Sequence, residues 1–409
     1  MKCRHCGTEL TLPLIDLGSA PPSNSYLTPA ALFGPEKWYP LRVLVCTGCW
    51  LAQTEDYAHH AELFAEDYAY FSSFSTSWLA HAKRYVEDMV DRFALDRDSH
   101  VVEVASNDGY LLQYVRERGI SCLGIEPTAS TAAAARKRGI EVFERFFGVE
   151  LAKELAAAGQ RADLMAANNV LAHVPDINDF VAGFDCLLKD DGVATFEFPH
   201  LLNLVKQNQF DTVYHEHFSY LSLTAVTRIF EANGLTVFDV DELPTHGGSL
   251  RVYAQRSATG PHAVTPRVGA ALGRERDAGM ATADFYSGFQ ARAERVKNDL
   301  VAFLIDARRQ GLKVAGYGAA AKGNTLLNFA GIRGDLIEFV VDRNPAKQGK
   351  FLPGCRIPVV GEDALRSARP DLIVVLPWNL RDEVVAQLDY VREWDARFVV
   401  AVPALEVIG

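Results

Sequence analysis

The pattern of hydrophobic and polar positions changes several times along the chain. Up to about residue 70, short apolar runs are interrupted by prolines, which predicts a small, loop-rich unit. From Trp78 to Phe93 the apolar residues recur at helical spacing, and the apolar segment Val101–Ala105 then runs into a polar turn. The first pattern therefore predicts a small module, and the second predicts the start of a larger domain.

Strand-like and helix-like segments alternate after this point. Helices are expected at Tyr110–Arg118 and at the alanine-rich residues 129–138, and further strands are expected at residues 122–126, 162–167 and 193–198. Alternation of this kind predicts a parallel sheet with crossover helices.

A second alternating block follows a change in composition. Residues 257–267 are rich in proline, threonine and glycine and are predicted to form a linker, followed by a long amphipathic helix from about 268 to 310. Strands are then expected at residues 313–317, 337–342 and 372–376. The chain of 409 residues therefore divides into three expected parts, residues 1–70, 71–256 and 257–409.

Charge and composition exclude several classes of protein. The net charge of −11 argues against a nucleic-acid surface. The N-terminus lacks the basic and apolar pattern of a secretory signal, and no stretch approaches the roughly 18 apolar residues of a membrane span. Cys122, Cys186 and Cys355 fall in or beside apolar segments, as buried thiols do. We expect a cytoplasmic protein with a small-molecule substrate, and the sequence leaves the oligomeric state open.

Four cysteines occur as two Cys-x-x-Cys pairs, Cys3/Cys6 and Cys46/Cys49. Each pair places two thiolates on one tight turn, and two such turns complete the tetrahedral sulfur shell that zinc prefers. Four sulfur ligands leave no open position, so the expected zinc is structural. The alternatives are free or redox-active thiols, and a substitute ligand role for His5, which is otherwise expected to be solvated.

A nucleotide-binding loop is predicted directly after the strand at residue 101. Small residues at the carboxyl end of a strand, followed by a helix N-terminus, let the backbone approach a ligand. Glu126 ends the next strand, where a carboxylate can accept hydrogen bonds from both ribose hydroxyls of an adenosine. The pattern fits S-adenosylmethionine, with an ordinary strand-to-helix turn as the alternative. The expected cofactor residues are Glu103, Ala105, Ser106, Asn107, Asp108, Gly109, Glu126, Asn168 and Asn169.

The densest group of chemically active side chains is Tyr214-His215-Glu216-His217-Phe218-Ser219-Tyr220. Two histidines, a carboxylate and two tyrosines can supply a base, an orienting partner and a phenolic donor. In an extended segment His215 and His217 would share a face, whereas a helix would place them differently. A metal site and a solvated or core cluster are the alternatives.

Taken together, these motifs occur in an order that resembles the sugar C-methyltransferases. The order is Cys3-x-x-Cys6, Cys46-x-x-Cys49, the loop from Glu103 to Gly109, His173, Tyr214–His217 and Gly316–Gly323, and it spans nearly the whole chain. The resemblance implies an α/β fold with an N-terminal zinc-binding module, a central class I methyltransferase domain and a C-terminal Rossmann-like domain that helps to hold a sugar nucleotide. It also implies methyl transfer from S-adenosylmethionine to C3 of a nucleotide-linked 4-keto-deoxysugar.

By that resemblance the base matches His217, and the supporting positions match Tyr214, Glu216, His173 and a tyrosine near the substrate, Tyr68 in preference to Tyr70. A ketone at C4 acidifies the C3 proton, so a histidine can remove it to give an enolate. Tyr214 or a protonated His173 is expected to donate to the enolate oxygen, and Glu216 is expected either to fix the imidazole tautomer or to bind the sugar. The expected substrate contacts are Tyr70, His246, Lys322 and Asn324, and Arg251 in the loop after Thr245 is a further candidate beside a plain hairpin turn.

The C-terminal block also offers a rival function. Gly316-Tyr-Gly318-Ala-Ala-Ala321 matches G-x-G-x-x-G/A after a strand, and Asp342 ends the next expected strand. In isolation this pattern is typical of an NAD(P)-dependent oxidoreductase. A catalytically silent zinc scaffold is the third interpretation.

Overall fold

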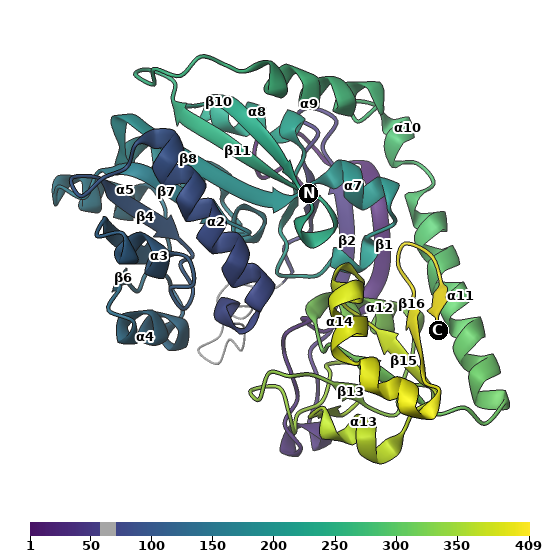
Figure 1. Ribbon diagram of the computed structural model, residues 1–409. Helices are drawn as coiled ribbons and strands as arrows, with labels where there is room; N and C mark the ends of the chain where they lie inside the picture. Colours follow the sequence, from purple (N-terminus) through teal and green to yellow (C-terminus); the bar gives the residue numbers. More distant parts are fainter. Residues whose placement is uncertain (58–70) are drawn as a thin grey trace.

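Three β-sheets organise the part of the chain that the computed structural model describes, residues 1–57 and 71–409. Figure 1 shows the largest sheet and its helices beside the C-terminal sheet, with the N-terminal strands β1 and β2 near α7 and α11. The α/β class expected from the alternating pattern is confirmed.

The N-terminal sheet is antiparallel and has the order β1-β2-β3-β9. Its fourth strand comes from a segment more than 160 residues later in the chain, and it consists of the last two residues of the Tyr214–Tyr220 cluster. The strands are β1 (Leu12–Ala20), β2 (Tyr39–Val45), β3 (Ala52–Thr54) and β9 (Ser219–Tyr220). The module is thus joined to the central domain by main-chain hydrogen bonds.

The central sheet has the order β10-β11-β8-β7-β4-β5-β6, and β4 to β8 run parallel while β11 is antiparallel to both of its neighbours. The order reverses between β4 and β7, so a ligand is expected at the carboxyl ends of these two strands. The strands are β4 (His100–Val104), β5 (Ser121–Ile125), β6 (Glu141–Phe143), β7 (Ala162–Asn168), β8 (Leu188–Pro199), β10 (Leu235–Leu243) and β11 (Ser249–Arg256).

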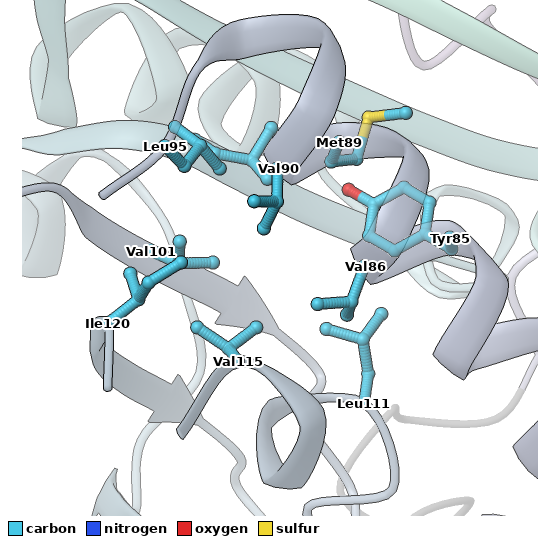
Figure 2. A pocket seen from close by; sticks show the side chains of 10 residues that line it. Tyr85, Val86, Met89, Val90, Leu95, Val101, Leu111, Val115 and Ile120 are labelled. Atoms are coloured by element: carbon cyan, nitrogen blue, oxygen red, sulfur yellow. The ribbon is translucent and has the colours of Figure 1, made fainter. Parts of the chain in front are cut away.

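Helices cover both faces of this sheet (Figure 1). They are α2 (Thr76–Phe93), α3 (Leu112–Glu117), α4 (Ala129–Lys137), α5 (Val149–Ala157), α6 (Ile177–Leu187) and α8 (Leu223–Ala232). Ser75 caps α2 by accepting a hydrogen bond from the Trp78 amide. Tyr85, Val86 and Met89 recur at helical spacing on its buried face. Figure 2 shows this face against β4 and α3, around an apolar cavity of only about 10 Å³ that is too small for a ligand.

The C-terminal sheet has the order β14-β13-β12-β15-β16-β17 and is parallel except for β17. Its strands are β12 (Val314–Tyr317), β13 (Val340–Val341), β14 (Val359–Val360), β15 (Leu372–Val375), β16 (Arg397–Val400) and β17 (Glu406–Ile408). Its helices are α12 (Ala321–Ala330), α13 (Asp363–Ala368) and α14 (Arg381–Gln387). The strand predicted over residues 337–342 is shorter in the structure, where only the two residues of β13 form it.

The single long helix predicted from 268 to 310 is wrong. The chain instead forms α9 (Pro266–Asp277), α10 (Ala283–Tyr286) and α11 (Phe289–Arg309). Gly279 and Gly288 adopt φ values of 83° and 75°, which lie in the left-handed region and interrupt a right-handed helix. The α9 helix also begins inside the segment that was predicted to be a linker.

Short elements complete the description. These are α7 (Leu201–Lys206) and the 3-10 helices η1 (Ala30–Phe33), η2 (Ser72–Phe74), η3 (Leu171–His173), η4 (Phe210–Thr212), η5 (Thr245–Gly247), η6 (Trp378–Leu380) and η7 (Asp389–Trp394). Among the helices of the described residues, none has the length and apolar character needed to cross a bilayer.

The N-terminal module packs on both larger domains. Its strand residues Leu14 and Val43 share a core with Phe289 and Leu300 of α11. The cysteine-bearing turns instead share a core with the central sheet and with Phe230 of α8. The module therefore bridges the two α/β domains rather than extending from one of them.

Candidate functional site

The predicted cofactor loop follows β4 at the point where the strand order reverses. Ala105, Asn107 and Gly109 adopt φ values of 58°, 48° and 78°, so three alternate residues lie in the left-handed region. Glycine is the usual occupant of such positions, and asparagine tolerates them better than alanine does. The loop thus has the backbone of a three-glycine loop although its sequence keeps one glycine.

Close packing holds the loop in this form. The amides of Ala105 and Ser106 both donate to the carbonyl oxygen of Ile125. A Cβ atom at Gly109 would lie 2.3 Å from Cδ1 of Ile140, and one at Gly124 would lie 2.5 Å from Oγ of Ser106. A side chain at either position would therefore force its neighbours to shift, and Gly109 also needs its positive φ.

Replacing Gly109 with alanine is expected to weaken S-adenosylmethionine binding by ~10-fold or more, about 1.4 kcal/mol, because Ile140 and the loop must move apart. The matched control is Gly119→Ala, since Gly119 has a φ of 73° but a Cβ there would meet only Nε of Arg97, at an ordinary contact distance of 3.9 Å. The control should lose about 1 kcal/mol of stability from backbone strain and keep its cofactor affinity. Titration calorimetry checks both variants, and equal affinities would contradict the packing role of Gly109.

Acidic residues surround the loop. Glu103 is fully buried in β4, and burial raises its pKa well above the usual value. Glu126 accepts hydrogen bonds from the amides of Asn107 and Thr128, each at 2.9 Å. Burial raises the pKa of Glu126 while these amides oppose the shift. Glu126 lies at the carboxyl end of β5, the position predicted for ribose recognition, and it also ties the loop to that strand.

Asp108 points toward a neighbouring segment. Its carboxylate accepts a hydrogen bond from Ser73 and lies 3.5 Å from the Arg138 guanidinium. Asn107 accepts from the Ser72 amide at 2.9 Å. The two side chains predicted to contact the cofactor thus also anchor η2 beside the loop.

Several polar atoms at this edge fit an S-adenosylmethionine molecule. Within residues 1–57 and 71–409, Oγ of Ser106 and the amide oxygens of Asn168 and Asn169 are buried without a hydrogen-bond partner. Asn168 ends β7 and Asn169 follows it with a φ of 54°. Buried polar atoms normally have partners, and a polar ligand between β4 and β7 would supply them.

The histidine cluster is a turn, neither an extended segment nor a helix. The amide of His217 donates to the carbonyl of Tyr214 at 3.0 Å. His215 donates from Nε2 toward the carbonyls of Tyr39 and Pro40, each at 3.2 Å, and so faces β2. His217 faces the other way, so the two histidines do not share a face.

His217 and His173 form a pair with defined protonation. Nδ1 of His217 is 3.0 Å from the Thr212 carbonyl oxygen, and Nδ1 of His173 is 2.7 Å from that of Glu216. A carbonyl only accepts, so each Nδ1 carries the proton and each Nε2 is an acceptor. The ring of His217 lies 4.6 Å from that of His173 and 4.0 Å from that of Tyr214.

Burial keeps both rings neutral. It lowers the pKa of His217 well below its usual value and the pKa of His173 to about 4. The prediction of a protonated His173 as donor therefore needs correction, because the neutral ring has its one N–H on Glu216. This pair can accept protons at neutral pH but does not bring a positive charge.

Within residues 1–57 and 71–409, the side-chain carboxylate of Glu216 makes no hydrogen bond to an imidazole, although its main-chain carbonyl accepts from His173. Its Oε1 accepts from the amide and the side chain of Asn24, each at 3.2 Å, and burial raises its pKa. The tautomer of His217 is fixed by Thr212 instead. Of the two roles predicted for Glu216, fixing that tautomer is excluded, and Oε2 is buried without a partner in the described part of the chain.

Two predicted substrate residues come from different parts of the chain, Lys322 from α12 of the C-terminal domain and His246 from η5. Lys322 donates to Asn379 at 2.6 Å and lies 4.5 Å from the Trp378 ring centre, and burial lowers its pKa. His246 packs edge-on against Trp78 at 5.3 Å, and burial and Lys322 lower its pKa to about 4. Both residues also lower the pKa of His217, so the structure brings all three within electrostatic range.

Asp211 completes this group. Its carboxylate accepts from Nε1 of Trp378 at 2.8 Å, and burial raises its pKa to about 6 while Lys322 opposes the shift. Asn324 lies apart, with its amide donating to the Ser23 carbonyl at 2.7 Å. Its predicted role in substrate binding is not favoured, because it is buried and holds the N-terminal segment. Tyr68 and Tyr70 lie outside the described residues.

A buried network at the end of β8 escaped the sequence analysis. Glu197 accepts from His81 at 2.9 Å, Arg251 at 3.0 Å and Thr245 at 3.1 Å. Burial alone would raise the pKa of Glu197, but the His81 hydrogen bond and the Arg251 charge hold it below the usual range. Arg251, a candidate for phosphate or sugar, is instead paired inside the protein. Nothing local in the sequence links these residues, which join only through strand pairing.

The four cysteines of the N-terminal module converge as predicted. Their sulfur atoms all lie within 4.8 Å of one another, with Cys3 and Cys49 at 3.5 Å and Cys6 and Cys46 at 3.5 Å. Tetrahedral zinc with Zn–S bonds of about 2.3 Å needs sulfur atoms roughly 3.8 Å apart. The amides of Gly48 and Cys49 point at the Cys46 sulfur. This cluster fits a structural zinc, and His5 is bonded to Asn178 at 2.8 Å instead.

The second glycine-rich loop is engaged by the protein itself. Asp342 accepts from the amides of Ala319 and Asn344, each at 2.8 Å. Tyr26 and Lys347 both donate to the Ala319 carbonyl. A nicotinamide dinucleotide would need the Asp342 carboxylate and the same backbone, so these contacts argue against the oxidoreductase alternative.

The strand order, the loop after β4 and the polar edge define a class I methyltransferase that uses S-adenosylmethionine. Family models agree: residues 3–64 match a zinc binding domain, residues 78–240 a methyltransferase domain and residues 244–403 a C-methyltransferase C-terminal domain. The chain is 36% identical to C-methyltransferase NovU of Streptomyces niveus over 408 residues, covering 100% of this chain and 97% of that protein. The chain therefore belongs to the C-methyltransferase family.

Solved methyltransferase structures match part of the chain at low sequence identity. Magnesium protoporphyrin IX methyltransferase from Synechocystis PCC 6803 with bound SAH is 16% identical, with 44% of this chain and 83% of that chain covered and a TM-score of 0.36. A S-adenosylmethionine-dependent methyltransferase from Clostridium acetobutylicum ATCC 824 is 8% identical, with 44% and 92% covered and a TM-score of 0.35.

Proposed function

We propose that this C-methyltransferase adds a methyl group to C3 of a nucleotide-linked 4-keto-deoxysugar, with His217 as the base. The observation that carries the proposal is the hydrogen bond from Nδ1 of His217 to the Thr212 carbonyl. It leaves Nε2 unprotonated beside Tyr214 and His173. A neutral imidazole whose Nε2 carries no proton can take up an acidic C–H proton as a general base.

The chemistry follows from the substrate's ketone. Nε2 of His217 takes the C3 proton, and the electron pair of the C–H bond moves toward the C4 oxygen as an enolate. S-adenosylmethionine, when bound, would supply the methyl group that the C3 carbon receives, with the S–CH3 bond breaking and S-adenosylhomocysteine left behind. The residues around His217 hold the sugar in place, since effective transfer needs the reacting atoms roughly 3–3.5 Å apart.

The developing charge on the C4 oxygen needs hydrogen-bond donors. Tyr214 supports this role because its ring lies 4.0 Å from that of His217. Lys322 supplies positive charge from the C-terminal domain, where it shares a cluster with Trp378 and Asn379. In this proposal His217 supplies the base, and Tyr214 and Lys322 supply the donors.

Incubation with S-adenosylmethionine and a panel of nucleotide-linked 4-keto-deoxysugars tests the proposal. At least one sugar should gain one methyl group at C3, detected by mass spectrometry and located by NMR. The matched control is the 4-hydroxy form of the same sugar nucleotide, which cannot form the enolate and should gain none. Methylation of an oxygen or of both forms would contradict the proposal.

The pH dependence should reflect the buried base. Burial lowers the pKa of His217 well below 6.5, so the imidazole stays unprotonated on mild acidification. Protonation of His217 abolishes base catalysis, and because its pKa is lowered this protonation begins only below the pH range of an ordinary histidine. We expect kcat/KM to be the same at pH 6.5 as at about pH 7.5. A decline centred near pH 6.5 would contradict the environment described for His217.

A further inference from the structure

Arg4 lies inside the first cysteine turn and reaches two segments of the central domain. Its Nη1 donates to the Pro175 carbonyl at 2.9 Å, and its Nη2 donates to the Thr54 carbonyl at 3.0 Å. The guanidinium also lies 5.4 Å from the ring centre of Phe218. Only 5% of the side chain is exposed, although its partner Asp56 is 53% exposed. A buried guanidinium with several directed bonds fixes the geometry of its neighbours.

The two segments that Arg4 joins carry the histidine pair. Pro175 is two residues beyond His173, and Phe218 directly follows His217. The two segments also meet each other through the hydrogen bond from His173 to the Glu216 carbonyl at 2.7 Å. Arg4 therefore touches the chain beside both histidines, and within the described part of the chain it makes no hydrogen bond to either imidazole.

Thr54 provides a second link from the same module. Its amide donates to the Phe218 carbonyl at 3.1 Å, and its hydroxyl donates to the His217 carbonyl at 3.1 Å. Adjacent residues of β3 pair with Ser219 and Tyr220 of β9. The main-chain carbonyl of His217 is thus bound by Thr54 of the N-terminal module, while its imidazole ring is bound by the Thr212 carbonyl.

We propose that Arg4 is a positioning residue for the methyl-transfer reaction, which holds the His173 and His217 segments at their working separation. This inference rests on the proposed role of His217 as base. Misplacement of a catalytic group by about 1 Å can lower a rate ~100-fold. The cysteine cluster supplies a rigid anchor for Arg4, because Cys3 and Cys6 flank it within one turn.

Arg4→Met tests the proposal, with Arg228→Met as the matched control. Arg228 is an exposed arginine of α8 that also joins the module to the central domain, donating to the Gly48 carbonyl at 2.7 Å. Arg4→Met should bind zinc and S-adenosylmethionine as the unmodified enzyme does, keep KM within about twofold and lose kcat ~10- to 100-fold. Arg228→Met should keep its kcat.

Two further variants distinguish positioning from support of the fold. Arg4→Lys retains a cation that reaches one of the two carbonyls, so its kcat should lie between those of Arg4→Met and the unmodified enzyme. Thr54→Val removes only the hydroxyl on the His217 carbonyl and should also lower kcat at unchanged zinc content. If Arg4→Met does not fold, these two variants decide the question.

The outcomes separate this inference from the proposed function. Rates are expressed per zinc-loaded, cofactor-binding molecule, so a loss of folded protein does not imitate a loss of kcat. The role of Arg4 alone would be overturned if Thr54→Val and either Arg4 variant kept an unchanged kcat while His217→Asn was impaired. An unimpaired His217→Asn would overturn the base assignment instead.

Discussion

Replacing His217 with asparagine is expected to lower kcat about 10²- to 10⁴-fold, the usual contribution of a general base. Asparagine keeps a side-chain donor that can reach the Thr212 carbonyl, now 3.0 Å from Nδ1 of His217, but it has no group that accepts a proton. The affinity for S-adenosylmethionine should remain unchanged, because the cofactor loop follows a different strand. Steady-state kinetics and titration calorimetry measure the two quantities separately.

His215→Asn is the matched control for this variant. His215 is also buried and lies two residues away, but its Nε2 faces the carbonyls of Tyr39 and Pro40. Losing these contacts should cost about 1 kcal/mol of stability and little activity. A rate loss in His215→Asn as large as that in His217→Asn would show that the turn as a whole, and not the imidazole of His217, is required.

Replacing Cys46 with serine is expected to release the metal and to unfold the N-terminal module. Cys46 is fully buried, and structural zinc contributes an apparent 10–16 kcal/mol in zinc-finger peptides near neutral pH. Because β3 pairs with β9 beside His217, activity should fall to background together with the metal content. Metal analysis, thermal unfolding and the methyltransferase assay are the measurements.

The control for the zinc variant is Cys186→Ser. Cys186 is a half-buried free cysteine of α6 and lies outside the cluster of four sulfurs. This variant should keep its zinc and its activity. A Cys46→Ser protein that retains full activity would contradict the coupling of the module to the active site.

The sequence predicted those features that depend on local residue pattern. The paired cysteines, the loop after β4 and the Tyr214–His217 cluster each occupy one short segment, and the four cysteine sulfurs converge as expected. The roles of the loop and cluster side chains stay predictions, and the Glu216 carboxylate has Asn24 as its partner instead of an imidazole. The positive φ of Ala105 could not be foreseen, because the surrounding strands impose that conformation on an unfavourable residue.

Features that depend on distant parts of the chain were missed. Glu197 and Arg251 meet only because β8 and β11 pair, with these two residues opposite one another. Arg4 meets Pro175 only because the cysteine turn packs on the central domain. The orientation of Glu216 toward Asn24 likewise depends on where the N-terminal segment lies. The chemistry of their side chains singled out Glu216 and Arg251 as candidate site residues. Their hydrogen-bond partners, however, are determined by tertiary packing.

Hydrogen exchange at C3 of the sugar tests the central claim most directly. A nucleotide-linked 4-keto-deoxysugar is incubated in heavy water with the enzyme and S-adenosylhomocysteine, which allows proton removal without methyl transfer. We predict that the unmodified enzyme introduces deuterium at C3 and that His217→Asn does not. Equal deuterium incorporation by the two proteins would contradict the assignment of His217 as the base.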